Sequence, residues 1–362
     1  MLEILSWLVL IVIAFILGTR VFLQGQDLSV FDRSIESSMW SGEPSEQHYN
    51  SIDSIAGLLE AGNEHKDRKT QLSEGRVAMD EWGASADMSG IRLENVDANG
   101  VPAEWVLAEG ADPDRRLLYI HGGAFMMGSP RSHRVITTTL SRITNASVLA
   151  IDYRLTPENK RVACIEDCQA AYKWILDNGP DSQAGAPDAF FIAGDSAGGN
   201  LTLTTIAWAR DMGLPSVNAA VALSPLTDST FSSPSMRSNI ETDHMLGPSL
   251  APMTKMPQML RAWIGLIMNR VKPNDPRVSP IFGDLSDLPP TLVQASEAEV
   301  LLDDSRRWVN KAQDAGTEAV LQTWPHVLHV WHIFGAEMPE AKEAFENIGH
   351  FIGKHDSAAS TI

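Results

Sequence analysis

The chain is poor in cysteine. Its 362 residues include only two, Cys164 and Cys168, which excludes a disulfide-rich fold and a cysteine-based metal cluster. The two lie four positions apart in a segment, Ala163 to Leu176, whose pattern predicts a helix. We expect two reduced thiols with a structural role, and this leaves the compartment open.

Positive charge is also scarce. Lys and Arg number 28 against 46 Asp and Glu, for a formal net charge of −18. Because an acidic surface repels phosphates, nucleic acid is excluded as a partner. Internal repeats and low-complexity tracts are absent from the sequence, and nothing in it bears on the oligomeric state.

A serine stands between glycines where a short apolar run gives way to a helical pattern. The segment reads Phe190-Phe-Ile-Ala-Gly-Asp-Ser-Ala-Gly-Gly-Asn200, and it predicts a buried strand over 190–193 followed by a helix over Leu201 to Met212. Small neighbours let Ser196 stand exposed on a sharp turn between strand and helix. This context favours Ser196 as a nucleophile, with Asp195 as a structural hydrogen-bonding residue.

A second glycine-rich turn follows another predicted strand. Leu117-Leu-Tyr-Ile120 leads into His121-Gly-Gly-Ala-Phe125, and consecutive glycines leave backbone N–H groups free to point at a ligand. Beside a nucleophile elbow, such donors stabilise the oxyanion of a tetrahedral intermediate. We expect Gly122, Gly123 and Ala197 to form an oxyanion hole.

The nucleophile needs a base and an acid, in the chain order Ser, acid, His. The candidate bases downstream are His326, His329 and His332, and the candidate acids are Glu297, Glu299, Asp303 and Asp304. An acid at the end of the predicted strand 292–295 is well placed to orient an imidazole, which favours the two glutamates. The aspartates are expected to stabilise a helix N-terminus.

The same three histidines raise a competing interpretation, a metal site built at three-residue spacing on one helical face. Pro325 and the β-branched Val327 and Val330 do not suit a helix there. A serine mechanism requires no metal and no organic cofactor, and we predict none.

Five blocks together resemble the bacterial hormone-sensitive-lipase-like esterases, also called family IV. The resemblance runs from about Trp82 to Phe351 and rests on His121-Gly-Gly-Ala-Phe125, Asp152-Tyr-Arg-Leu-Thr-Pro-Glu158, Gly194-Asp-Ser-Ala-Gly-Gly199, Asp275-Pro-Arg-Val-Ser-Pro280 and Glu299-Val-Leu-Leu-Asp-Asp304.

The resemblance implies a role for each matching residue. Ser196 corresponds to the nucleophile, His329 to the base, and Gly122, Gly123 and Ala197 to the oxyanion loop and elbow. The family's acid is usually an aspartate at the position of Glu299, so Asp303 stays open as an alternative. The implied fold is an α/β-hydrolase, with a mostly parallel central sheet, helices on both faces and a helical cap.

The implied activity is hydrolysis of carboxylic esters with short to medium acyl chains. Lactones and amides remain compatible with the same triad. A non-catalytic ligand receptor on a hydrolase fold is the alternative from another class, but such receptors usually lack a triad member, and candidates for all three are present here.

Length and pattern predict several parts. These are an N-terminal cap or arm at 26–81, a hydrolase core at 82–227 and 274–355, a cap insertion at 228–273 and a flexible tail at 356–362. Apolar residues recur at helical spacing between Met253 and Met268. This face is expected to pack on the core, to cover an acyl pocket, or both.

Residues 1–25 predict a membrane anchor. Ile4 to Leu17 is apolar except for Ser6, and continuing to Leu23 gives about 20 positions, the length of a membrane span. Glu3 precedes the run and no Ala-x-Ala site follows it, which favours an uncleaved anchor over a signal peptide. Arg20 alone does not determine the side of the membrane.

Overall fold

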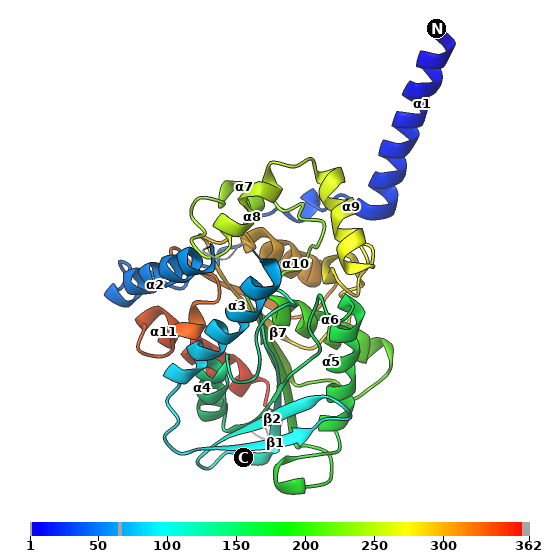
Figure 1. The fold of residues 1–362 in the computed structure, drawn as a ribbon. Coiled ribbons are helices and arrows are strands. Elements are labelled where there is room, and N and C mark those ends of the chain that lie inside the picture. Colours follow the sequence, from blue (N-terminus) through cyan, green and yellow to red (C-terminus); the bar gives the residue numbers. More distant parts are fainter. Residues whose placement is uncertain (1, 64–66, 357–362) are drawn as a thin grey trace.

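A computed structural model describes residues 2–63 and 67–356 (Figure 1). Its eight strands form one sheet, in the order β1-β2-β4-β3-β5-β6-β7-β8. The pairs β1 with β2 and β2 with β4 are antiparallel, and all later pairs are parallel. The strands are β1 (Ile91–Asp97), β2 (Pro102–Ala108), β3 (Asp112–Ile120), β4 (Ala146–Ile151), β5 (Ala189–Asp195), β6 (Ala219–Leu223), β7 (Thr291–Ser296) and β8 (Ala319–Trp324).

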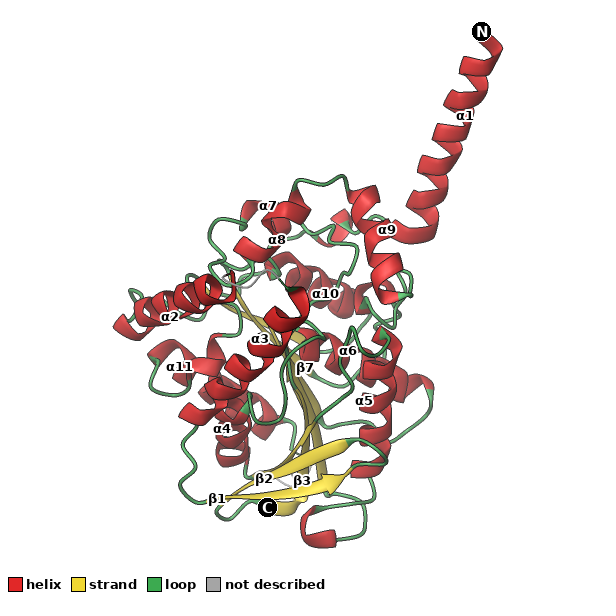
Figure 2. Ribbon diagram, in the orientation of Figure 1, coloured by secondary structure: helices red, strands yellow, loops and turns green. Residues whose placement is uncertain are grey.

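Helices surround the sheet, as Figure 2 shows. They are α1 (Leu2–Thr19), α2 (Glu46–Asn63), α3 (Arg68–Trp82), α4 (Arg134–Thr144), α5 (Arg161–Ile175), α6 (Ala197–Asp211), α7 (Ser235–Ser238), α8 (Gly247–Thr254), α9 (Gln258–Asn269), α10 (Leu302–Asp314) and α11 (Pro339–Lys354). The predicted fold class, a mostly parallel sheet covered by helices, is confirmed.

Alternation along the buried strands builds two apolar layers. In β3, Leu118 and Ile120 belong to one core cluster, which includes residues of α5, α6 and α10. Leu117 and Tyr119 belong to the other, with residues of α4 and α11. Because successive side chains of a strand point to opposite faces, one strand supplies both layers. The sheet is thereby covered on both sides, as parallel sheets require.

The two cysteines, which the sequence predicts to be reduced and structural, lie in α5. Cys164 and Cys168 are both free and buried, within a helix that begins at Arg161 and ends at Ile175. They contribute to the core layer between α5 and the sheet.

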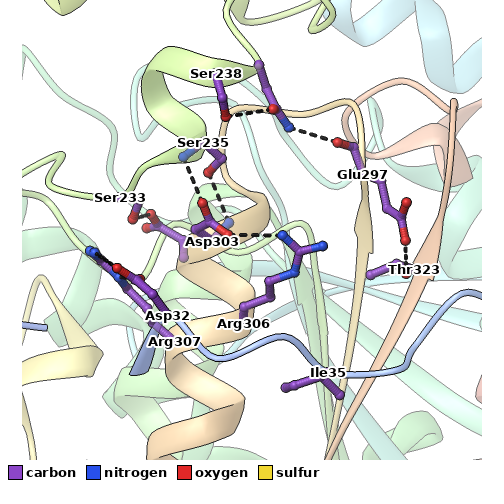
Figure 3. A network of polar contacts seen from close by, with 12 residues as sticks. Asp32, Ile35, Ser233, Ser235, Ser238, Glu297, Asp303, Arg306, Arg307 and Thr323 are labelled. Carbon is purple, nitrogen blue, oxygen red and sulfur yellow. Dashed lines mark hydrogen bonds and ion pairs between the residues drawn. The ribbon is translucent and has the colours of Figure 1, made fainter. Parts of the chain in front are cut away.

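The N-terminal segment after α1 lies along the core. We call residues 27–39 the strap. Leu28 is buried in the core, and Ser38 pairs with Thr323 as a parallel bridge at the outer edge of β8. The Asp32 carboxylate binds the buried guanidinium of Arg307 on α10, with an Oδ1 to Nε distance of 2.5 Å (Figure 3).

The predicted membrane span is not supported. Within residues 2–63 and 67–356, no helix combines the length and apolar content needed to cross a bilayer. The α-helix ends at Thr19, and the remaining apolar positions form a π-turn at Arg20–Gln24, whose Leu23 is buried.

The predicted tail at 356–362 lies outside the described residues apart from Asp356, which pairs with Arg115.

Candidate active site

Ser196 stands on the turn between β5 and α6. Its backbone has a positive φ of 51° with ψ −113°, an uncommon conformation for a non-glycine residue. Its N–H donates to the carbonyl of Leu223 on β6 over 2.7 Å. A Cβ at Gly198 would lie 1.9 Å from the carbonyl oxygen of Ile120, so the elbow requires glycine there.

The structure brings Ser196, His329 and Glu299 together. His329 follows β8, and its Nε2 lies 2.9 Å from Ser196 Oγ. Its Nδ1 lies 2.6 Å from Oε2 of Glu299, which follows β7. His329 and Glu299 are buried, with 3% and 0% of their side chains exposed. These contacts form a continuous hydrogen-bonded chain from a carboxylate to a serine hydroxyl.

The other candidate acids have different partners. Glu297 accepts a hydrogen bond from Thr323 Oγ1 over 2.9 Å. Asp303 accepts the N–H of Ser235 at the start of α7 and pairs with Arg306 (Figure 3). Asp304 accepts the amides of residues 227 and 228 over 2.7 and 2.8 Å. Glu299 alone of the four contacts His329.

The other two histidines also point elsewhere. His326 Nε2 lies 3.2 Å from Glu340, and His332 Nε2 lies 2.8 Å from Gln294 Oε1. The three imidazoles therefore do not converge on one point. No group of three His, Cys, Asp or Glu side chains suited to a metal ion occurs in the described part of the chain.

The glycine loop after β3 lies against the elbow. Gly123, Ala124 and Phe125 have positive φ angles of 104°, 54° and 63°, and a Cβ on Gly123 would lie 2.3 Å from the carbonyl oxygen of Met127. Ala197 is the first residue of α6, where amides have no intrahelical acceptor. The amides of Gly123 and Ala197 thus belong to segments beside Ser196.

The amide of Gly122 does not fit its predicted role as an oxyanion donor. That N–H donates to Asp195 Oδ1 over 3.0 Å, so it is already occupied. The cause is the register of β3 against β5, which pairs Ile120 with Gly194 and leaves the loop beside Asp195.

Asp195 is the centre of a buried polar cluster. Besides Gly122, its carboxylate accepts a hydrogen bond from Tyr119 Oη over 2.5 Å and contacts His133 Nε2 over 3.3 Å. Burial by itself raises the pKa of Asp195, but the charge and hydrogen bonds of His133 and Tyr119 outweigh burial and hold that pKa below its usual value. The sequence indicated a structural Asp195, but no local signal pointed to His133, which is 62 positions away.

The contact between His329 and Glu299 shifts the pKa values of both side chains. Burial lowers the pKa of His329, but the hydrogen bond and negative charge of Glu299 outweigh burial and raise that pKa above its usual value. Burial raises the pKa of Glu299, and His329 opposes the shift. The geometry thus suits a base that gains a proton while its carboxylate partner stays ionised.

Comparison with known proteins finds a matching family and several relatives. Residues 117–333 match the family model described as alpha/beta hydrolase fold. An acetyl-hydrolase of Streptomyces hygroscopicus is 37% identical over 250 residues, covering 69% of this chain and 79% of that protein. An esterase of Acinetobacter venetianus is 33% identical over 262 residues, covering 72% and 82%.

Solved structures of esterases are also similar to this chain. The crystal structure of an esterase from the bacterial hormone-sensitive lipase family superposes with a TM-score of 0.73 and 33% identity, covering 87% of this chain and 100% of that chain. This chain belongs to the hormone-sensitive-lipase-like esterases of the α/β-hydrolase fold. Glu299, which follows β7, contacts His329 in this chain.

Proposed function

We propose that this protein is a carboxylesterase that hydrolyses esters of short to medium acyl chains through Ser196, His329 and Glu299. The observation that carries the proposal is the hydrogen-bonded chain of the three side chains, over 2.6 and 2.9 Å. Relatives named as esterases and an acetyl-hydrolase support an ester substrate with a small acyl group.

In this proposal each of the three residues has one step. His329 Nε2 accepts the proton of Ser196 as Oγ attacks the ester carbonyl, and Glu299 holds the imidazole and stabilises its protonated form. The imidazolium then gives its proton to the departing alkoxide, which leaves an acyl-serine. A water molecule then gives a proton to the same imidazole while its oxygen attacks the acyl carbon. The imidazolium returns that proton to Ser196 Oγ as the acyl–oxygen bond breaks, which releases the carboxylic acid and the free serine.

The oxyanion formed in both half-reactions needs donors aimed at its position. We assign the amides of Gly123 and Ala197 to this role, while Gly122 holds the loop through Asp195. Such donors are fixed before reaction, so they stabilise the developing charge without reorganisation, and the loss of one typically costs about 3 kcal/mol of barrier stabilisation.

The test is hydrolysis of p-nitrophenyl esters from acetate to palmitate by the protein and by Ser196→Ala. We expect activity to be highest on short chains and to fall by roughly 10⁵-fold or more in the variant. Ser216→Ala is the matched control, because Ser216 is exposed and its hydroxyl donates to the neighbouring carbonyl of Val217.

A fluorophosphonate probe tests the nucleophile independently of the substrate. We expect one covalent adduct, located on Ser196 by peptide mass spectrometry and absent in Ser196→Ala. A folded protein that takes up no probe and hydrolyses no ester would instead support the receptor alternative. Activity that survives Ser196→Ala would exclude the serine mechanism.

A further inference from the structure

Two segments of this acidic protein contain no acidic residue. The chain has 46 Asp and Glu among 362 residues, yet residues 4–26 and 244–274 have none. The same segments carry Arg20, Lys255, Arg261, Arg270 and Lys272. They correspond to most of α1, the π-turn Arg20–Gln24, α8 and α9.

The two acid-free segments lie side by side. The rings of Phe15 on α1 and Trp263 on α9 stack with centroids 5.9 Å apart, and Trp263 Nε1 donates to Thr19 Oγ1 over 3.2 Å. Just after α9, Lys272 Nζ lies 3.7 Å from the centre of the Phe22 ring. In Figure 1, α1 leaves the body beside α9 and extends away from the sheet.

The joined segments expose apolar side chains to an unusual degree. Among the described residues, most exposed large apolar side chains lie on α1, the π-turn and α9. On α9, Leu260 and Ile267 are seven positions apart, hence on one helical face, and Ile267 and Met268 are each 72% exposed. Val21 of the π-turn is 78% exposed. We call the exposed residues of the π-turn and α9 the α9 face.

Exposed cations flank these apolar groups. Arg20, Lys255, Arg270 and Lys272 are all exposed, and no carboxylate is contributed by the segments that carry them. Apolar groups beside Lys and Arg are the combination that binds an anionic lipid surface. A second copy using the same face would bring together two faces that carry cations and no acidic residue of their own segments, which disfavours a symmetric dimer there.

We propose that the α9 face docks on the surface of an anionic phospholipid bilayer. Ile267, Met268 and Val21 enter the boundary between headgroups and acyl chains, while the cations contact lipid phosphates. The docking does not depend on the esterase function, and it requires no helix that crosses the bilayer.

The test places an environment-sensitive fluorophore at position 267 of the full chain, through Ile267→Cys. Both native cysteines are buried, so the label goes to the new thiol. Met212→Cys is the matched control, since Met212 is 56% exposed at the end of α6. Phosphatidylcholine vesicles with and without phosphatidylglycerol are then added.

We expect a blue shift and brighter emission at position 267 with the anionic vesicles, and no change at position 212. Lys255→Gln and Lys272→Gln should each weaken partitioning roughly fivefold, and high salt should act in the same direction. An unchanged spectrum at 267 while the protein sediments with vesicles would assign binding to α1 and overturn the proposal. So would a blue shift produced by protein concentration alone, which would indicate a second copy.

Discussion

The carboxylate of Asp195 accepts the backbone N–H of Gly122 over 3.0 Å. Asp195 directly precedes the serine of the elbow, and Gly122 begins the loop assigned to the oxyanion. One buried hydrogen bond thus connects the two segments that must be held in register around the reacting carbonyl. A Cβ at Gly122 would lie 2.1 Å from Asp195 Oδ2, so the contact also requires glycine.

Asp195→Asn should therefore impair the chemical step. The asparagine amide retains the shape of the side chain but loses the negative charge that Gly122, Tyr119 and His133 contact. The loop can then shift, and a displacement of about 1 Å at a catalytic group can lower the rate about 100-fold. We expect kcat to fall by roughly that factor with KM nearly unchanged, because the loop binds the transition state more than the substrate.

Steady-state kinetics and the affinity for a trifluoromethyl ketone, which mimics the tetrahedral intermediate, measure this effect. Both should weaken in parallel in Asp195→Asn. The exposed Asp211→Asn is the control and should leave both unchanged. A variant with normal kcat and normal inhibitor affinity would show that Asp195 does not position the loop.

Glu299→Gln and Asp303→Asn should separate the two acids. The glutamine lacks the charge that stabilises the imidazolium of His329, so kcat should fall about 10³- to 10⁴-fold. Asp303 binds Ser235 and Arg306 instead, so its variant should keep kcat within a few-fold and lose about 1 kcal/mol of unfolding free energy.

Ester hydrolysis and urea denaturation of both variants check this prediction. A larger loss of kcat in Asp303→Asn than in Glu299→Gln would reverse the assignment of the acid.

The pH dependence follows from the raised pKa of His329. The base must be neutral, so kcat/KM should be lost as the pH falls through that pKa. Because Glu299 raises the pKa, the midpoint of the acidic limb should lie above about 6.5, the usual value for histidine. In Glu299→Gln, burial then acts unopposed by that charge, and the limb should move to lower pH. A pH profile of kcat/KM for each protein measures both midpoints, and an unmoved limb would contradict the pairing.

The strap offers a matched pair of stability variants. Asp32 pairs with Arg307, whose side chain is 5% exposed, whereas Asp314 pairs with Arg33, whose side chain is 52% exposed. Asp32→Ala leaves a buried guanidinium without its carboxylate and should cost about 2 kcal/mol. Asp314→Ala removes a solvent-exposed pair and should cost about 0.5 kcal/mol or less.

Urea denaturation of both variants gives the two free energies. Equal losses would mean that the strap does not depend on the Arg307 contact. An unchanged slope of unfolding free energy against urea in Asp32→Ala would show that the strap stays docked in the folded protein.

Much of the fold was predictable because its signals are local. The predicted strands 190–193, 117–120 and 292–295 lie within β5, β3 and β7, since buried parallel strands are short apolar runs. The predicted helices at Ala163 to Leu176 and Leu201 to Met212 correspond to α5 and α6. Ser196 could be located for the same reason, because strand, turn and helix are consecutive.

The N-terminal membrane span that the apolar run predicts is not found among the described residues. The predicted span runs through Leu23, but that side chain is buried in the folded chain, and the α-helix gives way to a π-turn after Thr19. Hydropathy registers how apolar a segment is, and it does not register which of its residues pack on the rest of the chain.

The sequence by itself therefore determined the fold class, the elbow at Ser196 and a short set of acids and histidines that could serve it. Tertiary structure decided which of these acids and histidines come into contact, because the contacts depend on the directions of the loops that follow β7 and β8. It brought Glu299 to His329, turned Asp303 toward α7, and joined Asp195 to Gly122 and His133 across the register of β3 and β5. Residue spacing along the chain contains no information about those distances, since they are set by strand order and packing.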